Sequence, residues 1–264
     1  MSEVSDEVDA RSWPRARLLA TLYDWEHDEL QDDVALYRAL AGRTGGPVLE
    51  LACGSGRVLE ALLVDGLELV GLDRSPEMLE RARRRIGRAS RRVRLIDGDL
   101  AGPLPGGPFG LVVLALDALG FVHETIDQID LLRRIGAALA PGGLVAFDLV
   151  HAAALADQPQ GVAVLQRTGY VREIGAEAAK WMVRRISPAT QEIQIDCFFD
   201  LTWADGASTR LAESVALRFF GRYEIELLLA AASLELEAWG GDYQLGPFQD
   251  VSERMIVVAR AGDG

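Results

Sequence analysis

Two carboxylates and two glycines are the residues of this sequence whose spacing is best suited to chemistry. Glu50 lies in the short apolar run 48–52, Gly54 and Gly56 follow it, and Asp73 stands 19 residues after Gly54. Glycines remove side chains, so a ligand can lie against the backbone there. An acidic residue at about that spacing reaches ribose hydroxyls in doubly wound α/β folds. Because the charge of Glu50 would repel a pyrophosphate, the pattern favours a cationic, nucleoside-type ligand.

Other interpretations of this stretch stay open. A dinucleotide site, as in an NAD-dependent dehydrogenase, needs a third glycine where the chain has Leu59, and the charge of Glu50 disfavours it further. A phosphate-binding loop needs Gly-Lys-Ser/Thr, which the stretch lacks. An ordinary tight turn would share the glycines without the chemistry. A non-catalytic cofactor-binding or scaffold protein on the same fold would also have these glycines without the chemistry.

The elements that position these residues follow from hydrophobic periodicity and turn signals. Apolar runs predict buried parallel strands, and helical spacing with Ser75 and Pro76 at a start predicts helices between them. The predicted strands cover residues 48–52, 67–73, 93–96, 109–116 and 144–150, and the predicted helices 58–66, 76–86 and 126–139. A helix over 223–232 and strands over 234–239 and 255–259 follow near the C-terminus. This alternation predicts an α/β fold.

Several motifs resemble those of class I S-adenosylmethionine-dependent methyltransferases. Glu50-Leu51-Ala52-Cys53-Gly54-Ser55-Gly56 is similar to the first motif of that family, E/D-x-G-x-G-x-G, with alanine in place of the first glycine. Gly98-Asp99-Leu100 and the Leu-x-Pro-Gly-Gly segment 139–143 are further family-like features. Residues 217–254 resemble the small-molecule branch that includes amino-sugar N,N-dimethyltransferases. The resemblance spans about 23–259.

The resemblance implies a Rossmann-like, doubly wound fold with a seven-stranded, mostly parallel sheet. It also implies S-adenosyl-L-methionine as the cofactor, with Asp73 at the ribose and Asp99 at the adenine amino group. The reaction implied is methyl transfer to N or O of a small molecule by direct in-line displacement. The expected cofactor-binding residues are Tyr23, Glu50, Ala52, Gly54, Gly56, Arg57, Asp73, Arg74, Met78, Asp99, Leu100, Ala115 and Leu116.

The segment after the strand 109–116 is expected to line the point of methyl transfer. His123 is the first candidate for a catalytic base, because a histidine can accept a proton at neutral pH. A surface histidine at a helix start is the alternative. Tyr23 is the second catalytic candidate, and a tyrosine packed at a helix end is its alternative. The expected substrate-binding residues are Phe121, Arg218 and Tyr243.

Two regions outside this sheet are expected to cover the ligand. Residues 1–45 carry two predicted helices, one opening at Pro14 and one over 28–41, and form an N-terminal lid. From 162 to 220 the pattern has period two with a hairpin turn at 204–207, which predicts an inserted antiparallel β cap. A dimerisation sheet is the competing interpretation, and a homodimer is left open. Residues 46–161 and 221–264 form the predicted Rossmann-like domain.

Composition excludes several other classes of protein. The net charge of −13 disfavours binding to nucleic acid and to an anionic membrane surface. The two cysteines, Cys53 and Cys197, indicate neither a disulfide framework nor a metal cluster, so no metal is expected. No stretch of about 18 uninterrupted apolar residues occurs, and the acidic N-terminus shows no signal peptide. The expectation is a cytoplasmic enzyme with a small-molecule acceptor.

Overall fold

The computed structural model describes residues 9–155 and 159–262 and divides into two compact units. The larger unit consists of Leu30–Gln158, Ile186–Ile193 and Ala216–Gly264. The smaller unit consists of Met1–Glu29, Pro159–Arg185 and Gln194–Val215. Residues 1–8 of the predicted lid, and residues 156–158 and 263–264 of the predicted Rossmann-like domain, lie outside the described residues.

The larger unit is built on a seven-stranded sheet with the order β10-β11-β5-β4-β1-β2-β3. Neighbouring strands among β1 to β5 pair in parallel, whereas β11 runs antiparallel to both β5 and β10. The strands are β1 (Val48–Leu51), β2 (Leu69–Asp73), β3 (Val93–Asp97), β4 (Phe109–Leu114), β5 (Leu139–Val150), β10 (Leu234–Gly240) and β11 (Arg254–Ala261). The predicted mostly parallel, seven-stranded sheet is confirmed. Since β1 pairs with β2 on one side and β4 on the other, the strand order reverses there, which is where such sheets bind ligands.

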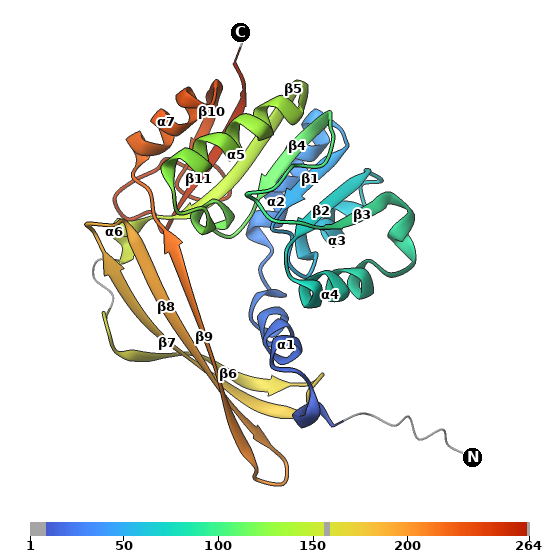
Figure 1. Cartoon of the computed structure of the whole chain (residues 1–264), viewed down its shortest axis with the longest axis vertical. Coiled ribbons are helices and arrows are strands. Elements are labelled where there is room, and N and C mark those ends of the chain that lie inside the picture. Colours follow the sequence, from blue (N-terminus) through green and yellow to red (C-terminus); the bar gives the residue numbers. More distant parts are fainter. Residues whose placement is uncertain (1–8, 156–158, 263–264) are drawn as a thin grey trace. The chain divides into compact units, whose positions relative to one another are not determined.

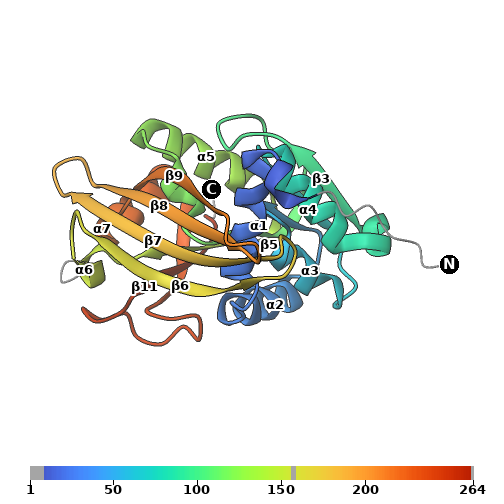
Figure 2. The same ribbon diagram turned by 90° about the horizontal axis from the view of Figure 1, so that it is seen from below.

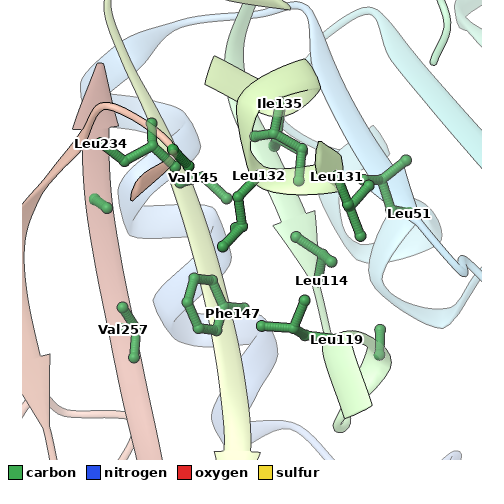
Figure 3. Close-up of a cluster of buried hydrophobic side chains, with 14 of the residues drawn as sticks. Leu51, Leu114, Leu119, Leu131, Leu132, Ile135, Val145, Phe147, Leu234 and Val257 are labelled. Atoms are coloured by element: carbon green, nitrogen blue, oxygen red, sulfur yellow. The ribbon is translucent and has the colours of Figure 1, made fainter. Parts of the chain in front are cut away.

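Helices cover both faces of this sheet and bury two apolar clusters (Figure 1). One face packs against α2 (Asp32–Thr44), α3 (Arg57–Leu63) and α4 (Pro76–Ile86). The other face packs against α5 (Thr125–Ala138) and α7 (Arg222–Ala231). Figure 3 shows the second cluster, in which α5 and the strands meet, with the labelled residues Leu51, Leu114, Leu119, Leu131, Leu132, Ile135, Val145, Phe147, Leu234 and Val257. The doubly wound architecture follows from the continuous apolar strands, because both of their faces are buried.

Several predicted boundaries differ from the observed ones. The strand predicted to reach residue 116 ends at Leu114, because Leu116 and Asp117 have φ values of 51° and 64° that a strand does not allow. The second N-terminal helix starts at Asp32 and continues past Gly42 to Thr44, where Gly45 follows with a φ of 74°. The strand predicted over 144–150 begins earlier, at Leu139, which pairs with Phe109, so the segment 139–143 is already part of β5.

Four short helical segments complete the described elements, the first of them in the smaller unit and the other three in the larger unit. They are η1 (Ala10–Ser12), η2 (Gly87–Arg92), η3 (Ala118–Phe121) and α6 (Ala152–Leu155). Of these, η3 matters for the site, because it carries the chain from the end of β4 toward α5. None of the four is part of the predicted element pattern.

The smaller unit packs one helix on an antiparallel sheet with the order β6-β7-β8-β9 (Figure 2). Its elements are α1 (Arg15–His27), β6 (Ala163–Val171), β7 (Ala176–Ser187), β8 (Glu192–Trp203) and β9 (Ser208–Arg218). Residues 186–187 of β7, 192–193 of β8 and 216–218 of β9 belong to the larger unit. The core of the unit joins Leu18 and Leu22 of α1 to Phe199, Leu201 and Trp203 of β8. The predicted period-two insertion is therefore an antiparallel sheet, and its role as a cap stays a prediction.

The two N-terminal helices do not belong to the same unit. Helix α2 packs into the larger unit, where Tyr37 is fully buried and Leu40 is 6% exposed. Helix α1 packs into the smaller unit. The observed units thus differ from the predicted grouping of both helices in one lid over 1–45.

Candidate active site

The turn that follows β1 holds three residues in the left-handed region of backbone space. The φ values of Ala52, Gly54 and Gly56 are 55°, 53° and 79°. A Cβ atom at Gly56 would lie 3.1 Å from the Cβ of Ala82 in α4, so this glycine also permits a close helix contact. Ala52 carries the conformational cost that a glycine would avoid. Gly54 and Gly56 thus leave their own backbone without side chains at the carboxyl end of a central strand.

Asp73, at the end of β2, is tied directly to this turn. Its Oδ2 accepts the backbone N–H of Gly54 at 2.8 Å, and its Oδ1 accepts the backbone N–H of Ser75 at 2.8 Å. A carboxylate has about four lone-pair positions, so acceptor capacity remains on both oxygens. Asp73 is therefore held in one orientation beside the glycines, in a position suited to accept hydroxyl groups.

Glu50 is a buried carboxylate in β1, and one of its oxygens has no protein partner. The residue is 3% exposed, and among the residues that the structure describes no donor hydrogen-bonds to its Oε2. Burial raises the pKa of Glu50 to about 8, although Arg57 opposes the shift. A positively charged ligand group at Oε2 would satisfy that atom and favour its ionised form. The site therefore fits a ligand that carries a cation.

Arg57, at the start of α3, is engaged within the protein. Its guanidinium donates to Asp33 of α2 at 2.8 and 2.5 Å and to the carbonyl of Leu30 at 2.9 Å. Arg57 and Asp33 are only 8% and 2% exposed, respectively. This buried pair joins α2 to the glycine turn, and the predicted direct contact of Arg57 with the cofactor stays a prediction.

The remaining predicted cofactor residues follow β2, β3 and β4 at the same edge of the sheet. Asp99 forms an exposed ion pair with Arg74 at 3.5 Å, and its Oδ1 accepts the backbone N–H of Ala101 at 2.9 Å. Leu100 beside it is 9% exposed. Met78 lies in the first turn of α4, where its N–H donates to the Oγ of Ser75. The other two are Ala115 and Leu116, both half-buried.

A buried carboxylate that sequence reasoning missed lies beside this edge. Asp148 of β5 is fully buried, and its Oδ1 accepts the hydroxyl of Tyr37 at 2.7 Å and the backbone N–H of Leu116 at 2.9 Å. Its Oδ2 accepts the hydroxyl of Tyr243 at 3.0 Å and pairs with Arg254. The available signal was the same as for Glu50, a carboxylate inside an otherwise apolar strand. Tyr243, predicted to contact substrate, is thus bonded to Asp148.

Asp117 extends this cluster toward the end of β5. Its Oδ2 accepts from Arg254 at 2.9 Å and its Oδ1 accepts the N–H of Val150 at 2.5 Å. Burial raises the pKa of Asp117, and the nearby Arg254 opposes that shift. Burial also acts to lower the pKa of Arg254, but the carboxylates of Asp148 and Asp117 outweigh it and raise the pKa. Arg254 therefore holds two carboxylates together as a charged cluster.

His123 lies between η3 and α5, in the segment predicted to face the acceptor. Its Nδ1 is 3.3 Å from Oε1 of Glu192, at the start of β8. Arg218 donates to the carbonyl of His123 at 3.4 Å and pairs with Glu224 at 3.3 Å. Phe121, in the same segment, is 42% exposed. Three of the predicted acceptor-side residues therefore gather here.

Tyr23 is the predicted site residue that lies in the smaller unit. It belongs to α1, where its ring stacks on His27 with centroids 4.1 Å apart. Its carbonyl lies 2.8 Å from Nδ1 of His27. Its catalytic and cofactor-binding roles stay predictions.

Residues 9–155 and 159–262 hold no group of three or more His, Cys, Asp or Glu side chains arranged to bind a metal ion. In the same residues, no helix combines the length and apolar character needed to cross a membrane.

Comparisons with known proteins bear on both fold and chemistry. Residues 48–143 match a family model described as a methyltransferase domain. The cypemycin N-terminal methyltransferase of a Streptomyces species is 27% identical over 230 residues, which cover 85% of this chain and 86% of that protein. The dTDP-3-amino-3,6-dideoxy-alpha-D-glucopyranose N,N-dimethyltransferase of Streptomyces fradiae is 27% identical over 84% of this chain and 86% of its own length.

Solved structures show the same fold. An S-adenosylmethionine-dependent methyltransferase from Clostridium acetobutylicum superimposes with a TM-score of 0.78 at 17% identity, covering 93% of this chain and 98% of that one. The CcbJ methyltransferase from Streptomyces caelestis gives a TM-score of 0.77 at 23% identity over 94% and 98% of the two chains. The seven-stranded sheet with helices on both faces is therefore the Rossmann-like fold of these structures. The chain is a class I methyltransferase that uses S-adenosyl-L-methionine, as its motifs predicted.

Proposed function

We propose that this enzyme transfers a methyl group to the nitrogen of a small-molecule amine. The single observation that carries the proposal is the pair formed by His123 and Glu192 in the segment that follows β4. A protonated amine has no free lone pair, so a base next to it is needed before it can accept a methyl group. Relatives named as an N-terminal methyltransferase, an N,N-dimethyltransferase and an N-methyltransferase support nitrogen over oxygen.

In this proposal the larger unit holds the cofactor with its own carboxylates. S-adenosyl-L-methionine supplies a methyl group that is activated on a sulfonium. Glu50 accepts from a cationic group of the cofactor through its free Oε2. Asp73 accepts from the ribose hydroxyls, and Asp99 with Leu100 receives the adenine. Gly54 and Gly56 carry no side chains, so the cofactor can lie against the backbone there.

The acceptor side of the proposal uses the segment between β4 and α5. His123 accepts the proton of the amine, with Tyr23 as the second candidate for that role. Phe121 offers an exposed ring to an apolar part of the acceptor, and Arg218 and Tyr243 are the other proposed substrate-binding residues. The sheet β6-β9 and helix α1 act as a cap and lid that exclude water during transfer.

The proposal also covers the compartment, the partners and the assembly of the enzyme. Both cysteines are free thiols, which favours the cytoplasm. The net charge of −13 argues against nucleic acid as the acceptor. Strand β6 is an edge strand with Leu165 and Tyr170 exposed, and a homodimer through this edge is the proposed assembly.

A product screen tests the proposed reaction. The full chain is incubated with S-adenosyl-L-methionine and pairs of small molecules that differ only in carrying an amine or a hydroxyl. Mass spectrometry is expected to find one or two added methyl groups on the amines alone. Methylated hydroxyl products would overturn the choice of nitrogen. Binding of S-adenosylhomocysteine without any methylated product across the panel would favour the non-catalytic alternative.

A further inference from the structure

We propose that Glu192 is a positioning residue that fixes His123 with Nδ1 protonated and Nε2 as the atom that accepts the proton. The inference rests on the proposed function, since it gives a partner to the base named there. It concerns the described pair in the larger unit, where Nδ1 of His123 lies 3.3 Å from Oε1 of Glu192. The two side chains are 39% and 41% exposed, so both are partly accessible from solvent.

The backbone at His123 is held independently of Glu192. Gln128 of α5 is fully buried, and its Nε2 donates to the carbonyl of Val122 at 2.7 Å and to that of His123 at 3.5 Å. Arg218 donates to the same His123 carbonyl at 3.4 Å. The imidazole can therefore reorient only through its side-chain torsions. Glu192 is the contact that restrains them.

Glu192 is itself presented by an anchored turn. Gln191, just before it, has a φ of 52°, and its Nε2 donates to Oε2 of Glu224 at 2.7 Å. Its carbonyl accepts the N–H of Phe219 at 2.9 Å. Arg218 lies 3.3 Å from Glu224 and 3.4 Å from Oε1 of Gln191. This network fixes the start of β8, so the Glu192 carboxylate is held against the histidine and does not depend on a free loop.

The chemistry of a carboxylate decides which ring nitrogen is the base. An ionised carboxylate only accepts hydrogen bonds, so Nδ1 of His123 is the donor in this pair. In the neutral ring the proton then sits on Nδ1 and the lone pair on Nε2. When Nε2 takes a proton from an ammonium group, that N–H bond breaks and its electron pair stays on the amine nitrogen. The imidazolium that forms is stabilised by Glu192, as in other base–carboxylate pairs.

The charged groups around the ring support this assignment. Glu192 faces Nδ1, and Glu124 follows His123 in the chain as the N-cap residue of α5. Arg218 faces the carbonyl of His123 and not its ring nitrogens, and its charge is paired with Glu224. Of these groups, Glu192 is the one placed to stabilise the protonated ring through a hydrogen bond. Glu124 gives a matched carboxylate for comparison.

The first test is NMR of the histidine rings in the full chain with S-adenosylhomocysteine. The three histidines, His27, His123 and His151, are distinguished with the variant His123→Ala. In the wild type, Nδ1 of His123 is expected to show the shift of a protonated nitrogen and Nε2 that of an unprotonated one. Glu192→Gln should weaken this preference.

Control variants separate positioning from general charge effects. Glu124→Gln removes a carboxylate of the same charge next to His123 in the chain, and it should leave the tautomer preference of His123 unchanged. A thermal melt of each variant establishes that the fold is retained. An unchanged tautomer preference of His123 in Glu192→Gln would overturn the inference, whatever the enzyme methylates.

The second test is turnover with an amine acceptor found in the product screen. Glu192→Gln should shift the acidic limb of the kcat profile toward lower pH and leave the affinity for S-adenosylhomocysteine unchanged. A wild-type pH profile in Glu192→Gln, together with an inactive His123→Ala, would overturn the positioning role. If instead His123→Ala keeps full turnover, or no amine is methylated, the proposed function fails. The NMR experiment then still tests whether Glu192 fixes the tautomer of His123.

Discussion

The backbone N–H of Leu116 donates to Oδ1 of Asp148 at 2.9 Å, which joins the ends of β4 and β5. Leu116 and Asp117 both lie in the left-handed region, which costs non-glycine residues about 1–3 kcal/mol each. Asp117 adds a second link, because its N–H donates to the carbonyl of Asp148 at 3.2 Å. A buried carboxylate therefore holds a strained segment that leads directly into η3 and His123.

Asp148→Ala should destabilise the protein strongly. It leaves the partly buried charge of Arg254 less compensated and the hydroxyls of Tyr37 and Tyr243 without their acceptor. Breaking a buried pair in this way costs about 3–5 kcal/mol, and urea unfolding measures it. Tyr243→Phe is the matched control, since it removes a single hydrogen bond worth about 0.5–1.5 kcal/mol. Equal losses of unfolding free energy in the two variants would contradict the prediction that Asp148 contributes more than one hydrogen bond.

Asp73→Ala should weaken binding of S-adenosylhomocysteine by about 1.5–3 kcal/mol, because hydrogen bonds to charged groups are the stronger class. The variant also removes the acceptor of the Gly54 and Ser75 N–H groups, so the glycine turn loses its tie to β2. Asp99→Ala is a useful comparison, because Asp99 is exposed and is bonded to Ala101 N–H. Calorimetry of both variants measures the difference. Unchanged affinity in Asp73→Ala would remove Asp73 from the site.

The buried carboxyl of Glu50 should make stability depend on pH in the ligand-free protein. Its pKa is raised from 4.5 to about 8 by burial, with Arg57 opposing. A raised pKa means that its contribution is fully present below pH 4.5 and is lost as the pH rises through 8. The slope in this window is on the order of 1 kcal/mol per pH unit. Glu50→Gln should remove that slope, raise stability at pH 8 and weaken cofactor binding, which unfolding and calorimetry at several pH values can measure.

Glu50 also gives a signature for the bound cation. If the cofactor's positive group binds at Oε2, it favours the ionised carboxylate, and the protein should release a proton on binding near pH 7. Calorimetry in buffers of different ionisation enthalpy counts that proton. Proton release that persists unchanged in Glu50→Gln would assign it to another group.

Glu50 and Asp148 show what the sequence could and could not predict. Both are carboxylates inside apolar strands, but only Glu50 is followed by glycines that mark a ligand turn. The partners of Asp148 lie 111, 95 and 106 residues away in Tyr37, Tyr243 and Arg254. Local periodicity predicted the strands that carry both residues. It holds no information on such distant pairs, nor on which unit receives α1 and which receives α2.

The predicted end of β4, at residue 116, was wrong for a related reason. The run 109–116 is apolar throughout, and nothing in its composition signals that Leu116 adopts a φ of 51°. That conformation is held by Asp148, a tertiary contact. The position of Ala52 in the motif, by contrast, was informative, since the family's glycine at that place matches the positive φ found there.

Ala52→Gly should stabilise the protein. Its φ of 55° is costly for alanine, and glycine adopts it freely, so the gain is expected to be about 0.5–1 kcal/mol after the entropy of glycine is counted. Ala61→Gly, in the middle of α3, is the control and should cost about 1 kcal/mol. Thermal and urea unfolding measure both changes. A loss of stability in Ala52→Gly would show that the methyl group of Ala52 contributes packing that outweighs the backbone strain.

His123→Ala should lower kcat about 10²- to 10⁴-fold with an amine acceptor, the usual contribution of a positioned base. The Asp148 cluster that holds its segment is untouched, and so are Glu50 and Asp73, so the affinity for S-adenosylhomocysteine should not change. Some turnover should remain, because proximity and orientation act without a base, and raising the pH should restore part of it by deprotonating the amine in solution. Tyr23→Phe is measured beside it as the second candidate. Near-normal turnover with an unchanged pH profile in His123→Ala, and a large loss in Tyr23→Phe, would move the role of the base to Tyr23.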